Sequence, residues 1–182
     1  QGEADRIEGS YAWRYRCLEG EWSFIDGYLG PQSCQVSAEL GDFVVAKKEG
    51  NPAYQLAVVV DDHAMQITEV VRGDDLLAST FRQLQLYSTF GWSPPKFYHV
   101  PLVVGPDGKR LAKRHGDSRL AYYRERNVPP QRILGLLAYS IGLQPDCREC
   151  SAEELIHSFR WDRLHRQVCW NFTSSHESWL LG

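Results

Sequence analysis

The sequence predicts an α/β fold, because strand-like and helix-like segments alternate along much of its 182 residues. An apolar, β-branched segment at 67–71 indicates a buried strand, with helical patterns before it at 54–65 and after it at 79–91. Another strand-like segment follows at 97–104. This order is typical of strands joined by helices, and short helices are expected beyond residue 118.

Three earlier strands are expected in the first quarter of the chain. Apolar and basic residues alternate at 11–16, as they do in a half-buried strand. Residues 22–27 are rich in aromatic and apolar side chains and end in a turn, and 42–46 form a short apolar segment.

The segment at 54–65 fits either a strand or a helix. Its β-branched run from Leu56 favours a strand. However, a parallel strand at 67–71 could not follow so closely, because a parallel crossover needs about a dozen residues. Leu56, Val60 and Ala64 recur at i, i+4 spacing, which favours a helix. We therefore predict a helix here.

The helix at 79–91 is expected to begin with Ser79 as its N-cap and to end at Gly91. Ser151 and Glu154 form a capping-box pattern that predicts another helix start. The remaining expected elements are a strand at 97–104, a turn at 105–108, a basic loop at 109–117 and helices at 118–126 and 130–141.

Composition excludes several classes of protein. The net charge is only −3, so any site for a polyanion must be local. No apolar run approaches the ~20 residues that cross a bilayer. We expect no membrane partner, a cytoplasmic location and free thiols at the five cysteines. Cys147 and Cys150 form a lone CxxC pair without two further ligands in view, so no metal site is expected.

The basic loop has four cationic side chains within six positions, Lys109, Arg110, Lys113 and Arg114. Such a loop can neutralise the charge of a phosphate group. Taken alone, the pattern more often means a solvated basic turn.

Arg72 follows the strand at 67–71 and precedes a glycine, which is where open α/β sheets place ligand groups. Its guanidinium could hold a carboxylate through two hydrogen bonds, or could pair with Asp74 or Asp75 for structure. Tyr54 offers a phenol hydroxyl at a helix start, although a single tyrosine there is more often part of a core.

These features occur in one order and spacing, and the sequence resembles class I aminoacyl-tRNA synthetases of the glutamyl and glutaminyl type. The resemblance covers most of residues 40–143, and four segments carry it: 53–62, 67–87, 98–117 and 132–143. Within the family, the segment that begins at Ala53 is most similar to the glutamyl-queuosine tRNA(Asp) group.

The resemblance implies a role for each candidate residue. The family's KMSKS-type loop reads Arg110-Leu111-Ala112-Lys113-Arg114 here. It implies that this loop binds ATP, that Lys113 is the catalytic lysine which stabilises phosphate charge, and that Arg110 and Arg114 support it. Ala112 departs from the family's usual serine. Tyr54 and Arg72 match positions that bind the substrate glutamate.

The resemblance also implies an organisation. We expect residues 1–117 to be the C-terminal half of a Rossmann-like synthetase catalytic domain and 118–182 to be a helical extension that contacts tRNA. The family's HIGH-type motif is not in the sequence, so we expect a fragment of a longer, monomeric enzyme. That enzyme would use ATP with Mg²⁺ to activate glutamate and would transfer it to tRNA.

Two alternatives stay open from the sequence. Glutamate could be attached to the tRNA end or to a modified base, and the chain could instead be a non-catalytic module that binds tRNA or a partner. The aromatic side chains Trp170, Phe172 and Trp179 lie in a polar tail, and an exposed cluster of them would mark a lost interface.

Overall fold

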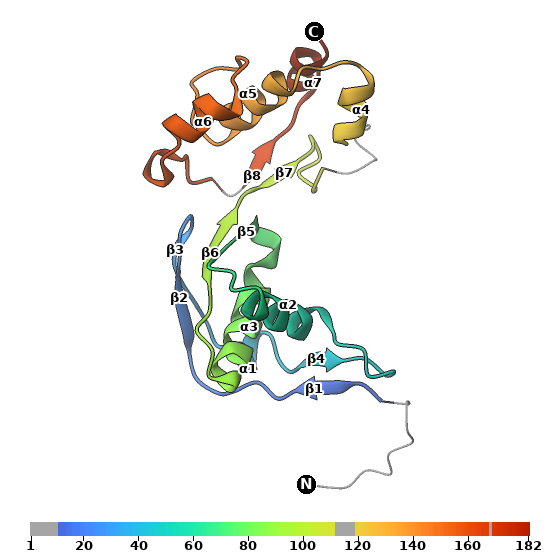
Figure 1. Cartoon of the computed structure of the whole chain (residues 1–182), viewed down its shortest axis with the longest axis vertical. Coiled ribbons are helices and arrows are strands. Elements are labelled where there is room, and N and C mark those ends of the chain that lie inside the picture. The colour runs from blue at the N-terminus through green and yellow to red at the C-terminus, as the bar shows by residue number, and fades with distance from the viewer. Residues whose placement is uncertain (1–10, 112–118, 168) are drawn as a thin grey trace, which may run out of the picture. The chain divides into compact units, whose positions relative to one another are not determined.

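The computed structural model describes residues 11–111, 119–167 and 169–182. These residues fall into two compact units, which divide between Val100 and Pro101 (Figure 1). We call them the first and the second unit and describe each by itself. The boundary predicted after residue 117 falls within a segment outside the described residues.

The first unit is a mixed α/β assembly, as predicted. Its elements are β1 (Trp13–Tyr15), β2 (Trp22–Asp26), β3 (Gly30–Cys34), α1 (Val36–Glu39), β4 (Phe43–Ala46), α2 (Tyr54–Ala64), β5 (Glu69–Gly73), the 3-10 turn η1 (Asp74–Leu76), α3 (Leu77–Phe90) and β6 (Lys96–Val100). β1 pairs with β4 and β2 with β3, both antiparallel, whereas β5 and β6 are parallel and are connected by α3 (Figure 1).

The predicted helix at 54–65 is confirmed as α2, and the predicted end of α3 at Gly91 is confirmed by its left-handed backbone, φ 68°. Ser79 as an N-cap is wrong. The chain already winds through η1 into a helix that begins at Leu77, so Ser79 lies in the first turn of α3. The strand expected at 67–71 begins two residues later, because the chain reverses after α2 at Gln66, φ 55°.

The strand β3 was not expected, because Gly-Pro-Gln-Ser-Cys has little strand propensity. It forms by pairing along its whole length with β2, from Trp22 opposite Cys34 to Asp26 opposite Gly30. Gly30 takes a positive φ of 81° at the start of the strand. Tertiary pairing overrides local propensity here.

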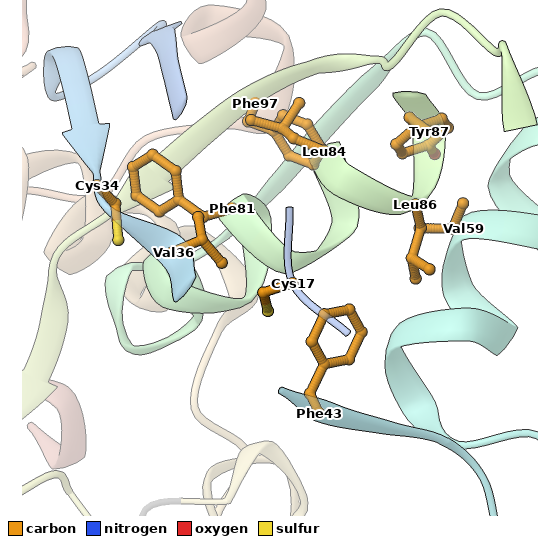
Figure 2. Close-up of a cluster of buried hydrophobic side chains, with 10 residues drawn as sticks. All are labelled: Cys17, Cys34, Val36, Phe43, Val59, Phe81, Leu84, Leu86, Tyr87 and Phe97. Carbon is orange, nitrogen blue, oxygen red and sulfur yellow. The ribbon is translucent and has the colours of Figure 1, made fainter. Parts of the chain in front are cut away.

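The apolar core of the first unit lies around α3 (Figure 2). Phe81, Leu84 and Tyr87, the face predicted from the sequence, are buried on this helix. Leu86 of the same helix is buried too, and the other buried members come from the neighbouring parts of the chain: Cys17, Cys34, Val36, Phe43, Val59 and Phe97. The polar residues Thr80 and Gln83 of the same helix are also buried, so α3 has a buried polar face as well as an apolar one.

The second unit contains β7 (Leu102–Val104), α4 (Leu120–Glu125), α5 (Pro130–Ser140), α6 (Ala152–Ser158), the 3-10 turn η2 (Trp161–Arg163), β8 (Cys169–Asn171) and α7 (Ser174–Leu181). β7 and β8 form a parallel pair. The strand expected at 97–104 is therefore interrupted at Pro101, which has no backbone N–H to donate to a sheet. β8 and α7 were not predicted.

The predicted capping box is confirmed at the start of α6. The backbone N–H of Glu154 donates to Ser151 Oγ at 3.1 Å, and the N–H of Ser151 donates to Glu154 Oε2 at 2.6 Å. Trp170, Phe172 and Trp179 are partly buried and pack against a small core of Tyr123, Val128, Leu136 and Leu180. They belong to the core of this unit and do not form an exposed cluster. Within the described ranges no helix is long and apolar enough to span a membrane.

Candidate active site

Arg72 lies at the carboxyl end of β5, directly opposite His99 of β6 in the parallel register. Its Nε donates to His99 Nε2 at 3.1 Å, and its Nη2 donates to Thr80 Oγ1 at 2.5 Å and to Gln83 Oε1 at 2.8 Å. All three acceptors are uncharged groups when His99 is neutral. Arg72 is thus held in a fixed orientation by neutral partners, and its positive charge is not neutralised by any of them.

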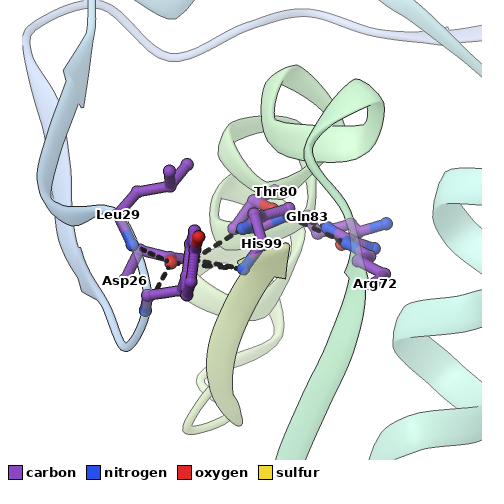
Figure 3. Close-up of polar contacts among 7 residues, drawn as sticks. Asp26, Leu29, Arg72, Thr80, Gln83 and His99 are labelled. Carbon is purple, nitrogen blue, oxygen red and sulfur yellow. Dashed lines mark hydrogen bonds and ion pairs between the residues drawn. The ribbon is translucent and has the colours of Figure 1, made fainter. Parts of the chain in front are cut away.

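His99 is fully buried, and its second ring nitrogen contacts the buried carboxylate of Asp26 (Figure 3). The Nδ1–Oδ2 distance is 2.6 Å. Burial lowers the pKa of His99, and this outweighs the opposing effect of Asp26, so the ring is neutral near pH 7. The carboxylate can only accept at Nδ1, so Nδ1 carries the proton and Nε2 accepts hydrogen bonds from Arg72 and Thr80.

The carboxylate of Asp26 is fixed by the backbone of the turn that follows β2. Its Oδ1 accepts from the N–H groups of Tyr28 at 2.9 Å and Leu29 at 2.8 Å. The backbone N–H of His99 also donates to this carboxylate, at 3.1 Å to Oδ2. Asp26 is therefore held at one end of the arrangement and Arg72 lies at the other, with His99 between them (Figure 3).

The hydrogen bonds continue from Gln83 to the helix that carries Tyr54. Gln83 Nε2 donates to Gln55 Oε1, and Gln55 Nε2 donates to Ser79 Oγ, both at 2.9 Å. We refer to the connected residues Asp26, Gln55, Arg72, Ser79, Thr80, Gln83 and His99 as the polar network. It joins β2, α2, β5, α3 and β6 of the first unit.

Tyr54 and Arg72, both predicted from the sequence, are brought together. Tyr54 is the first residue of α2, is 53% exposed, and its hydroxyl interacts with the Arg72 guanidinium. Burial lowers the pKa of Arg72, and the contact with Tyr54 opposes that effect. An exposed phenol beside a half-buried guanidinium is an arrangement that can receive a carboxylate from solvent.

The basic loop is described only at its start. The predicted turn at 105–108 is present, since the N–H of Gly108 donates to the carbonyl of Gly105 at 2.9 Å. The backbone N–H of Leu111 donates to the carbonyl of Val103 at 2.9 Å, and the backbone of Arg110 forms an isolated antiparallel β-bridge with Val104. These contacts anchor the beginning of the loop to β7. Ala112, Lys113 and Arg114 lie outside the described residues.

Sequence reasoning missed Asp26, His99, Thr80, Gln83 and Gln55. One signal was available for His99, which follows the buried Phe97 by two residues and so lies on the same face of β6. Thr80 and Gln83 are three residues apart and share a helix face. Asp26 gave no signal, because its turn could not be placed beside β6 from sequence alone.

The cysteines show no arrangement that suggests a metal ion. Among the described residues, no group of three or more His, Cys, Asp or Glu side chains is placed to hold one. Cys150 is buried, and burial raises the pKa of its thiol. Gln144 Nε2 donates to its sulfur at 3.7 Å.

Comparison with known proteins identifies the family of the chain. The family model described as tRNA synthetases class I (E and Q), catalytic domain, matches residues 7–175. The chain belongs to this family. It is 46% identical over 170 residues to a glutamyl-Q tRNA(Asp) synthetase of Rhodopirellula baltica, covering 86% of this chain and 52% of that protein. It is 41% identical over 152 residues to a glutamate–tRNA ligase of Syntrophus aciditrophicus, covering 83% of this chain and 31% of that protein.

A solved structure supports the same assignment. The glutamate tRNA ligase of Elizabethkingia meningosepticum, solved in complex with its amino acid, matches 91% of this chain with a TM-score of 0.76 and 28% identity. The match covers 36% of that structure. The chain therefore spans about half or less of the length of these synthetase relatives.

Proposed function

We propose that this protein activates glutamate with ATP and transfers the glutamyl group to tRNA. The observation that carries the proposal is Arg72, which lies at the carboxyl end of β5 beside Tyr54. Its direct hydrogen-bond acceptors, His99, Thr80 and Gln83, are neutral, and the carboxylate of Asp62 acts on it through charge rather than through one of these hydrogen bonds, so the guanidinium can still bind a substrate carboxylate. Membership of the synthetase family supplies the reaction type.

The proposed reaction has two steps. An ionised carboxylate oxygen of glutamate attacks the α-phosphate of ATP, and pyrophosphate leaves as the acyl–phosphate bond forms. A nucleophile of the tRNA then attacks the carbonyl carbon and AMP leaves. The attacking carboxylate is already ionised at neutral pH, so the first step needs no general base.

The proposed roles follow from this chemistry. Arg72 neutralises a carboxylate of glutamate, and the hydroxyl of Tyr54 hydrogen-bonds to it. Lys113 stabilises the phosphate charge that develops as pyrophosphate leaves, with Arg110 and Arg114 as supporting cations. ATP enters with Mg²⁺ bound to its phosphates. The cytoplasmic location and the monomeric state stay predictions.

The test is glutamate-dependent ATP–pyrophosphate exchange by the full-length protein. Arg72→Ala should lower kcat/KM for glutamate about 100-fold or more, because it leaves the substrate carboxylate without its cationic partner. Tyr54→Phe should have a smaller effect. Arg16→Ala, which removes an exposed cation of the same unit, serves as the control and should leave exchange unchanged.

If the full-length protein shows no exchange activity but binds tRNA, the chain is part of a non-catalytic module and this proposal is wrong. Exchange that is insensitive to Arg72→Ala would retain the reaction but remove Arg72 from glutamate binding.

As the finer proposal, we infer that the acceptor is the modified base of tRNA(Asp). Three glutamyl-Q tRNA(Asp) synthetases are 46–48% identical to this chain over 135–170 residues, which supports this choice. Glutamate should then become attached to tRNA(Asp) that carries the modified base, and exchange should proceed without tRNA. Attachment only to the 3′ end of tRNA(Glu) would assign the ordinary glutamyl synthetase reaction instead.

A further inference from the structure

We propose that Asp26 and His99 are positioning residues that set the orientation of Arg72 through the protonation pattern of the imidazole ring. The proposal rests on the proposed function, because its main readout is the binding of glutamate by Arg72. Neither residue needs to touch the substrate. Both are buried in the structure, with 1% of Asp26 and none of His99 exposed to solvent.

The carboxylate of Asp26 has a fixed orientation. Two successive backbone amides, those of Tyr28 and Leu29, donate to Oδ1, so this oxygen faces the turn. Oδ2 is left to face His99 and accepts from Nδ1 at 2.6 Å. A carboxylate held in this way imposes the tautomer in which Nδ1 carries the proton.

The other ring nitrogen of His99, Nε2, faces Arg72 and Thr80. With the proton on Nδ1, Nε2 presents a lone pair toward Arg72 Nε at 3.1 Å and Thr80 Oγ1 at 2.9 Å. With the opposite tautomer, two N–H groups would face each other at that distance, and Arg72 would have to move. The carboxylate of Asp26 thus determines the orientation of a guanidinium that it does not touch.

The burial of the Asp26 carboxylate beside the apolar core is unfavourable if its role is structural alone. His99 and Asp26 lie beside the apolar core, and the rings of Phe24 and Phe97 are 6.3 and 6.2 Å from the imidazole. Burying a carboxylate is costly unless its hydrogen bonds are made, so apolar side chains alone would stabilise this part of the core at a lower cost. A network that begins at a buried carboxylate and ends at a half-buried arginine with neutral partners is suited to preorganising a ligand contact.

Asp26→Asn tests the proposal without changing the shape of the side chain. The asparagine oxygen keeps the two turn amides and can also accept from the backbone N–H of His99, which lies 3.2 Å from Oδ1. Its NH₂ group then faces Nδ1 and requires the opposite tautomer of His99. In the full-length protein we expect KM for glutamate to rise about tenfold or more, because Arg72 is displaced. KM for ATP should stay within about twofold. A merely structural role would reduce kcat through a smaller active fraction and leave both KM values unchanged, and that result overturns the proposal.

The tautomer can be observed directly with ¹⁵N-labelled histidine by NMR. We expect the proton on Nδ1 of His99 in the wild-type protein and on Nε2 in Asp26→Asn. Wild-type His99 with its proton on Nε2 overturns the proposal even if the variant does not fold. Thr80→Val, which removes the hydroxyl shared by Arg72 and His99 and keeps the side-chain shape, should also raise KM for glutamate selectively.

A double-mutant cycle separates this proposal from the proposed function. If Asp26 acts through Arg72, then Asp26→Asn should raise KM for glutamate no further in an Arg72→Ala background. Additive effects overturn the proposal. No effect of Arg72→Ala by itself would instead overturn the role of Arg72 in glutamate binding. Asp42→Asn is the matched control, since Asp42 also accepts a backbone amide, that of Cys17 at 2.9 Å, but lies outside the polar network.

Discussion

The two units use buried polar side chains in different ways. In the first unit, Asp26 bonds to His99 and His99 to Thr80, while Thr80 and Gln83 both accept hydrogen bonds from Arg72. Each of these bonds joins side chains from two different elements. Side chain to side chain bonds are a small minority in folded proteins. Such a concentration around one half-buried arginine indicates a site for a charged ligand.

In the second unit, the buried polar residues Ser140 and Gln144 bond mainly to backbone, as Gln85 of the first unit does with the backbone of Leu18. Ser140 donates to the carbonyl of Leu137 at 2.7 Å, and Gln144 donates to the carbonyl of Gly135 at 3.1 Å. These bonds satisfy local carbonyl groups near the end of α5 and lead to no further side chain with a charge. Burial of a polar group therefore does not by itself indicate function, whereas the group to which its hydrogen bonds lead does.

The largest effect that would test this comparison is expected for His99→Leu. The substitution removes the imidazole N–H that donates to the buried Asp26 carboxylate, and losing a hydrogen bond to a buried charged group costs about 3 kcal/mol. Urea unfolding of the 182-residue chain should show this loss. Adding Asp26→Asn removes the stranded charge and should recover part of it. A loss below about 1 kcal/mol would contradict the view that Asp26 depends on His99.

Gln144→Leu is the matched substitution in the second unit. It removes a buried amide that donates to two backbone carbonyls, those of Gly135 and Arg148. We expect a loss of about 1–3 kcal/mol, because these acceptors lose a donor but no charge is stranded. KM for glutamate in the full-length protein should not change. A selective change in KM would contradict this distinction between the units, because it would connect a buried polar group of the second unit to the substrate.

The pH dependence of stability and of glutamate binding should also distinguish the two units. Burial lowers the pKa of His99 in the first unit and of His176 in the second from the ordinary value of 6.5. The unfolded chain therefore binds these protons first, so stability is complete above about pH 6.5 and falls as the pH drops toward the folded pKa values. The loss is at most about 1.4 kcal/mol per pH unit for one proton.

Only His99 should transmit this pH effect to the substrate, because a protonated Nε2 faces Arg72. Asp26, Arg72 and Asp74 are the charged groups that act on His99. Burial raises the pKa of Asp74 from 3.8, and protonating it at low pH has the opposite effect on stability. Unfolding and glutamate KM should be measured between pH 7.5 and 5.5. In His176→Gln, the pH dependence of KM should persist while part of the stability change disappears.

The sequence predicted the elements whose signals are local. The i, i+4 spacing in α2, the glycine that ends α3 and the capping box of α6 each depend on residues close together in the chain. The sequence also indicated Arg72 and Tyr54 as site residues, since the end of a buried strand and the start of a helix are positions that can be inferred locally. The roles of both stay predictions.

The polar network could not be predicted because it is made by tertiary contacts. Asp26 and His99 are 73 residues apart and meet only because the turn after β2 lies beside β6, where Gly27 N donates to Phe97 O at 2.8 Å. Gly27 also permits this approach, since a Cβ there would lie 2.0 Å from the ring of Tyr98. No local pattern specifies such a contact. The strand β3 was missed for a different reason, because its sequence has little strand propensity although it pairs with the strand directly before it.

The smallest effect is expected at Tyr87, which is near the polar network but is not part of it. Tyr87 lies one turn beyond Gln83 on α3, is 2% exposed, and its hydroxyl has no hydrogen-bond partner among the described residues. Burial raises its pKa to about 12. Removing an unsatisfied buried hydroxyl releases its desolvation penalty, so Tyr87→Phe should leave stability unchanged or raise it by about 1 kcal/mol. KM for glutamate should stay within about twofold in the full-length protein. A destabilised variant with a raised KM would show that the Tyr87 hydroxyl helps to position Arg72. Residues near the polar network, and not only its hydrogen-bonded members, would then affect glutamate binding.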